Sequence, residues 1–164
     1  MSQPNVTVNV NNGYGPQGGY QQGGYQQGVY PPAVQLPANY SLLKLIFLGL
    51  ITLGIYPLVI YSRAGEAVNT IASRWDGRRT MHYCLLFFII NPITCGIGML
   101  VWAHRISNRI GNELRRRGHS TNFSASTFWL WNVLGALIVV GPFVYLHKLS
   151  KAMNMLCQNY NTNG

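Results

Sequence analysis

Few side chains in this chain of 164 residues could perform acid–base or nucleophilic chemistry. The three acids, Glu66, Asp76 and Glu113, are far apart in the sequence and lie outside its long apolar stretches. A hydrolase or transferase needs a nucleophile with a base, a paired acid and base, or a metal ion. His82-x-Cys84 offers two zinc ligands, which is half of a site. We therefore predict that the protein is not an enzyme, and we expect no cofactor and no metal.

Basic residues dominate the charged side chains. Twelve lysines and arginines give a formal net charge of +9, yet only 9% of all residues are charged, against about 25% in a soluble domain. This excess suits either nucleic acid or an anionic membrane surface. The apolar stretches favour the membrane, so we expect a bilayer with anionic lipids as partner and no nucleic acid. The residues expected to contact lipid headgroups are Arg63, Arg105, Arg109, Arg115, Arg116, Arg117 and Lys148.

Three apolar segments must position these cations. They comprise residues 42–61, 81–103 and 128–146, and each is long enough to cross a hydrocarbon core of about 30 Å as one helix. After each segment, apolar residues recur at helical spacing, for example at Ala64 and Val68. This spacing predicts an amphipathic helix that continues each segment and lies along the headgroups.

The first 38 residues have a different composition. Gly-Gly-Tyr-Gln-Gln occurs at residues 18–22 and again at residues 23–27. Glycine and glutamine bury little apolar area, so nothing offsets the entropy lost on ordering such a stretch. We predict a disordered tail over residues 1–38, a helical membrane domain over residues 39–160 and a disordered C-terminus at residues 161–164. The tail is either a solvated spacer or a binding segment for a protein partner, and without a signal-peptide pattern it is expected in the cytoplasm.

The apolar segments are copies of one unit. Residues 52–63 align with residues 94–105 at a shift of 42, and residues 104–111 align with residues 147–154 at a shift of 43. The third copy lacks the Thr-x-Gly-Ile motif that the other two share. A repeat of this length indicates that one supersecondary element was duplicated.

Two arrangements of the apolar segments remain open. Three straight spans would place equal numbers of basic residues on the two sides, so the positive-inside rule would not orient the chain. Helix-breaking residues lie near the middle of every segment, namely Gly54 and Pro57, Asn91-Pro92 and Gly96, and Gly135 and Gly141-Pro142. If each segment bends there into a re-entrant hairpin, all basic residues face the same side.

Several motifs outside the tail form a recognisable set. They are Thr52-Leu-Gly-Ile-Tyr56, its partial copy at residues 94–97, and the stretches at residues 74–77, 111–118 and 128–135. Over about residues 40 to 160 the chain resembles a bacterial membrane-protein family catalogued as domain of unknown function 4234. The resemblance implies a small multi-pass protein of the bacterial plasma membrane and brings no catalytic residue with it.

The sequence therefore predicts an all-α membrane protein of three repeated apolar helical units, arranged as spans or hairpins and continued by amphipathic helices. The expected function is a non-enzymatic scaffold or adaptor that binds anionic lipid through these basic helices. The alternative is an oligomeric channel or transporter subunit, with Asn91 and Thr94 as candidates for its pathway.

Overall fold

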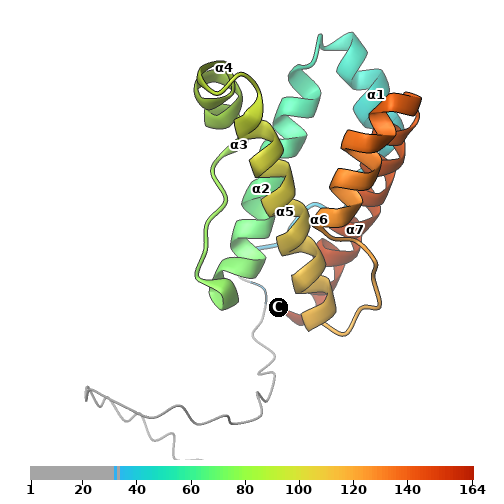
Figure 1. Cartoon of the computed structure of the whole chain (residues 1–164). Coiled ribbons are helices and arrows are strands. Elements are labelled where there is room, and N and C mark those ends of the chain that lie inside the picture. Colours follow the sequence, from blue (N-terminus) through green and yellow to red (C-terminus); the bar gives the residue numbers. More distant parts are fainter. Residues whose placement is uncertain (1–31, 33) are drawn as a thin grey trace, which may run out of the picture.

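The computed structural model describes residue 32 and residues 34–164, so most of the predicted tail lies outside the described residues. The described residues form helices joined by loops, without a strand among them. Figure 1 shows three long helices side by side, α2 (Ile55–Asp76), α5 (Ile97–Arg116) and α7 (Gly141–Asn163). Helices α2 and α5 end near Gly77 and Gly118, which have the positive φ angles typical of helix stops.

A shorter helical arm precedes each long helix and runs back along it (Figure 1). The arms are α1 (Leu42–Ile51); α3 (Tyr83–Leu85), η1 (Leu86–Ile90) and α4 (Asn91–Ile93); and α6 (Ala125–Thr127), η2 (Phe128–Val133) and η3 (Leu134–Ile138). We call the resulting units hairpin 1 (residues 42–76), hairpin 2 (83–116) and hairpin 3 (125–163). Their turns, here called the tips (residues 50–55, 92–97 and 137–141), lie at the upper end of Figure 1, and the C-terminus lies at the opposite end.

The Thr-x-Gly-Ile motif forms the tips of hairpins 1 and 2. The Thr52 hydroxyl donates to the carbonyl of Leu48 at 2.6 Å and accepts from the backbone N–H of Tyr56 at 2.9 Å. It thereby joins the last turn of the arm to the first turn of the long helix. Thr94 makes the equivalent pair of bonds in hairpin 2. The glycine of each motif has a φ of 91°, which a residue with a Cβ rarely adopts.

Hairpin 3 closes differently, because it lacks the motif. Its arm and long helix meet at Gly135 and Gly141, where a Cβ on Gly141 would lie 2.3 Å from the Cα of Gly135. Two glycines therefore allow the backbones to approach each other where the other hairpins use a threonine.

The fold-class prediction, an all-α membrane protein of spans or hairpins, needs a correction. Among the described residues, no helix combines the length and the apolar character needed to cross a membrane. The physical reason is that the chain reverses at each tip. An apolar segment long enough to span a membrane is therefore divided into two shorter, antiparallel helical parts. The described residues thus form an all-helical fold without a spanning helix.

The amphipathic helices also differ from the expectation. Their apolar stripes do not face outward along headgroups; they pack against each other in the half of the molecule away from the tips. This core contains the fully buried Val68 and Ile71 of α2, Ile106, Ile110 and Leu114 of α5, and Met153, Leu156 and Cys157 of α7. Each buried aliphatic side chain contributes about 1.5–3 kcal/mol, so the three helices form a bundle with its own hydrophobic core.

The ends of the described chain are held by α7. The backbone N–H and C=O of Leu36 pair with the side-chain amide of Asn161, and those of Tyr40 pair with Asn154, all at 2.7–2.8 Å. Residues 34–38, predicted as part of a disordered tail, are thus fixed on the bundle. Helix α7 continues to Asn163, so the predicted C-terminal disorder at residues 161–164 is wrong for all but the last residue.

Candidate functional site

The tips carry a large exposed apolar surface. Of the large hydrophobic side chains that are exposed in the described residues, all but Val34 and Trp75 lie in the three apolar segments. Leu53 is 94% exposed and Leu137 is 86% exposed. Exposed apolar side chains in such number mark an interaction site, because contact with water does not stabilise them.

Three residues at the tips have backbone conformations that would normally favour glycine or asparagine. Leu53, Cys95 and Val139 have φ angles of 51°, 48° and 63°. A turn in water usually places glycine, asparagine or aspartate at such positions. Leucine and valine there combine an unfavourable backbone conformation with an exposed apolar side chain.

Three exposed cations follow the apolar segments at equivalent positions in the repeat. Arg63 and Arg105 each lie eight residues beyond the first residue of their long helix, and Lys148 lies seven residues beyond. At a rise of about 1.5 Å per residue, each is about 10–12 Å from its tip. None has a carboxylate within ion-pair distance in the described part of the chain. We call these three residues the cation ring.

Tryptophans lie at the level of the cation ring. The indole N–H of Trp129 donates to Nδ1 of His104 at 3.0 Å, next to Arg105. The ammonium of Lys148 lies 5.8 Å from the ring centroid of Trp131. Tryptophan and cations at one level are typical of the boundary between the hydrocarbon and headgroup layers of a bilayer.

Arg109, predicted to contact headgroups, instead holds the end of α2 and the loop that follows. Its guanidinium donates to Asp76 at 2.7 Å and to the carbonyl of Arg78 at 2.8 Å. It also donates to Asn69 and Thr80, and its side chain is only 9% exposed. Such a buried guanidinium, with its donors occupied, has a structural role.

Two arginines of the Arg115-Arg116-Arg117 cluster likewise have structural partners, and one does not. Glu113, 5% exposed, accepts bonds from both Arg116 and Arg117, and Arg117 is itself only 4% exposed. Arg117 also donates to Asn159 of α7 at 2.8 Å, and Arg116 stacks on Trp75. Only Arg115 of the three lacks a carboxylate partner and points outward, bonded to Asn112. The predicted headgroup residues Arg109, Arg116 and Arg117 therefore serve the bundle.

The ion pair of Asp76 makes the stability of the bundle depend on pH. Burial alone raises the pKa of the Asp76 carboxyl, but hydrogen bonds from Arg109 and the Arg78 backbone outweigh this and hold the pKa below its usual value. A lowered pKa stabilises the fold above the pKa of the unfolded state, about 3.9, and this contribution is lost as the pH falls through the folded-state pKa. We expect the urea midpoint to fall below about pH 4 by more in the wild type than in Asp76→Asn. Equal pH dependence of the two proteins would contradict this assignment.

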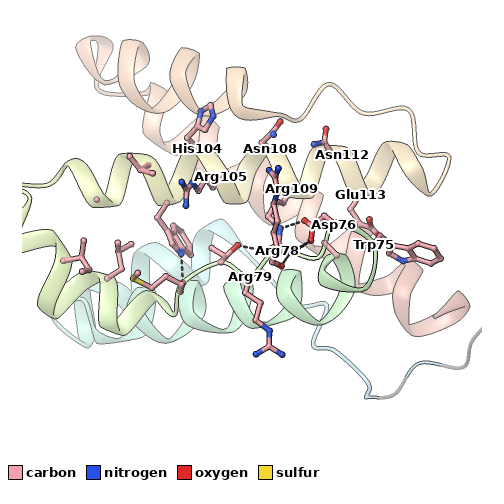
Figure 2. Close-up of a pocket in the computed structure, with 18 of the residues that line it drawn as sticks. Trp75, Asp76, Arg78, Arg79, His104, Arg105, Asn108, Arg109, Asn112 and Glu113 are labelled. Atoms are coloured by element: carbon pink, nitrogen blue, oxygen red, sulfur yellow. Dashed lines mark hydrogen bonds and ion pairs between the residues drawn. The ribbon is translucent and has the colours of Figure 1, made fainter. Parts of the chain in front are cut away.

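A groove with a volume of about 1170 Å³ runs along α5 (Figure 2). One part of its wall is apolar and belongs to hairpin 2, with Leu86, Ile90, Ile97 and Val101. The other part is basic and lies between α5 and residues 78–81, with five arginines against the carboxylates of Asp76 and Glu113. The cation-ring residue Arg105 lines this groove; Arg63 and Lys148 do not.

The comparisons with known proteins identify one family. The sequence model of the family described as Domain of unknown function (DUF4234) matches residues 40–112. Residues 40–112 carry the DUF4234 domain. The match covers hairpin 1 and nearly all of hairpin 2, the two units with a Thr-x-Gly-Ile tip, and confirms the family suggested by the motifs. No curated protein and no solved structure matches the chain.

The groove and the ion pairs of Arg109 and Arg116 could not be found from the sequence. Asp76 and Arg109 are far apart in the sequence, and their pairing depends on how α2 and α5 pack. The excess of twelve cations over three acids favours pairing of an acid with an arginine, as at Asp76 and Glu113, but Glu66 of α2 lies 3.9 Å from His82 instead. Asp76 and Glu113 thus neutralise arginines of the bundle, whereas Arg63, Arg105 and Lys148 near the tips have no carboxylate partner among the described residues.

Proposed function

We propose that this protein is a non-enzymatic lipid-binding scaffold whose three tips enter one leaflet of an anionic bilayer without crossing it. One observation carries the proposal: the exposed apolar side chains lie on the tips and the adjoining parts of the apolar segments, and three cations without a carboxylate partner among the described residues lie at one level below the tips. The distance of about 10–12 Å between tip and cation is somewhat less than half of a hydrocarbon core of about 30 Å. Tips at that depth would place the cation ring among the headgroups.

The remainder of the molecule suits a role as a platform. Beyond the cation ring, α2, α5 and α7 continue as a bundle with its own core, which would stand in the aqueous phase. Leu36 is held near the C-terminal end of α7, away from the tips. The tail would therefore leave the bundle on the side opposite to the lipid, where it can reach a protein partner. We place this assembly at the cytoplasmic face of the bacterial plasma membrane.

The cation ring gives the experiment for this proposal. Each cation near an anionic surface contributes about 1 kcal/mol, so the triple variant Arg63→Gln, Arg105→Gln, Lys148→Gln should lose about 3 kcal/mol of binding, or about a hundredfold in affinity. Vesicle flotation with phosphatidylglycerol in phosphatidylcholine measures this. Binding to pure phosphatidylcholine should change little.

Cations at the far end of the bundle provide the control. Arg74 and Arg115 are exposed in the last turns of α2 and α5, about 25–30 Å from the tips. The double variant Arg74→Gln, Arg115→Gln should keep nearly full affinity for anionic vesicles. An equal loss for both variants would show that charge acts without any preferred orientation, and no flotation of the wild type would reject the proposal.

The alternative of a channel or transporter subunit gains no support from its candidate residues. Thr94 uses its hydroxyl to close the tip of hairpin 2. The backbone carbonyl of Asn91 accepts from the N–H of Gly96 in the same tip, at 3.0 Å. Substituting Thr94 would therefore test the turn rather than a pathway, whereas a substitution of Asn91 keeps this backbone bond.

A further inference from the structure

The groove along α5 has an apolar part and a basic part. Its apolar part lies on hairpin 2 near the tip, and its basic part lies further toward the bundle end (Figure 2). A nucleic acid would use the basic part and leave the apolar part exposed. An amphiphile with a negative head and a hydrocarbon tail matches both parts at once.

Some arginines of the groove have a carboxylate partner and others do not. Arg109 and Arg116 are paired with Asp76 and Glu113. Arg78, Arg79 and Arg105 keep guanidinium groups without a carboxylate partner in the described part of the chain. Figure 2 shows Arg105 beside Arg109 on α5, whereas the guanidinium of Arg79 points away from α5. Arg105 is therefore the cation best placed to meet a negative group inside the groove, with the amide of Asn108 on the same wall.

The depth of the groove matches that of a lipid in a bilayer. Ile97 lies at the tip of hairpin 2, Val101 about 6 Å beyond it and Arg105 about 12 Å beyond it along α5. A phospholipid alongside hairpin 2 has its acyl chain near the first two residues and its phosphate near the third. We infer that this groove holds one anionic phospholipid, with its phosphate at Arg105 and an acyl chain along Leu86, Ile90, Ile97 and Val101.

The internal repeat provides matched controls for this inference, which rests on the proposed binding to bilayers. Arg63 and Val59 of α2 correspond to Arg105 and Val101 of α5 at the shift of 42, but they do not line the groove. Both arginines belong to the cation ring, and both valines are exposed. General attraction to a bilayer affects both members of a pair equally, whereas a lipid bound in the groove distinguishes them.

The experiment is native mass spectrometry of the full chain, delipidated in neutral detergent and reloaded with phosphatidylglycerol or phosphatidylcholine. We expect one phosphatidylglycerol per chain, at least about tenfold preferred over phosphatidylcholine. Arg105→Gln and Val101→Trp should each reduce this occupancy by about tenfold, because one removes the charge and the other fills the groove. Arg63→Gln and Val59→Trp should leave it unchanged.

Three results would overturn the inference. The first is an equal loss of phosphatidylglycerol occupancy in the two members of a pair, and the second is equal occupancy by the two lipids. The third is competition by glycerol phosphate as effective as that of the whole lipid, which would assign the site to a free phosphate. Vesicle flotation of the same variants separates this inference from the proposed function. If the wild type binds vesicles but the pairs behave alike, only the groove site fails; if it does not bind vesicles, the proposed function fails.

Discussion

Replacing Leu53 and Val139 with asparagine is expected to reduce the affinity for anionic vesicles by about a hundredfold and to leave the fold intact. Each aliphatic side chain that enters the hydrocarbon contributes about 1.5–3 kcal/mol, so the two together supply at least about 3 kcal/mol. Asparagine tolerates positive φ angles better than leucine or valine, so the turns should become no less stable. Flotation measures the affinity, and circular dichroism measures the melting temperature.

Val34 provides the control for this double variant, because it is exposed but lies far from the tips in sequence and on the segment held by α7. Val34→Asn should bind vesicles as the wild type does. Unchanged affinity in the double variant would contradict insertion of the tips. A lower melting temperature together with lower affinity would mean that the turns, and not the lipid contact, had been lost.

Glu113→Gln is expected to lower the free energy of unfolding by about 3 kcal/mol. The substitution leaves the guanidinium of Arg117 buried without its carboxylate, and an unpaired buried charge is strongly destabilising. Urea unfolding in neutral detergent measures the effect. Arg115→Gln is the matched control: its side chain is exposed, and we expect a change within about 0.5 kcal/mol.

This second prediction separates a structural role from a lipid-binding role within one basic cluster. If Arg117 contacted headgroups, the loss of Glu113 would free it for lipid and raise the affinity for vesicles without a large loss of stability. A change in stability below about 1 kcal/mol would contradict the buried ion pair.

Local features of the fold could be predicted from the sequence. The repeat located three equivalent units. Gly77 and Gly118 indicated the ends of two long helices, because a glycine that ends a helix depends only on the residues of the last turn. The motif at Thr52 and Thr94 also pointed to the family. Its physical role, a hydroxyl that joins two helical turns, became apparent only from the geometry.

Features that depend on packing between hairpins could not be predicted. The apolar segments are long enough to span, and their helix breakers left spans and hairpins equally open; the positive φ angles at Leu53 and Cys95, where the chain reverses, are visible only in the structure. An amphipathic stripe such as that of α2 is equally consistent with a lipid surface and with a partner helix. Likewise, Arg115 and Arg117 are indistinguishable in sequence, although one is exposed and the other is buried against Glu113.

The depth of the native Cys95 in a bilayer tests the central claim most directly. Cys95 is exposed at the tip of hairpin 2, whereas Cys157 is buried and Cys84 can be replaced by serine. A fluorophore on Cys95 should be quenched by lipids brominated near the middle of their acyl chains and protected from iodide in the water. A fluorophore on Ser120→Cys, in a Cys95→Ser background, should show the opposite because that loop lies at the bundle end. Quenching of the Cys95 probe by iodide but not by brominated lipid would contradict insertion of the tips.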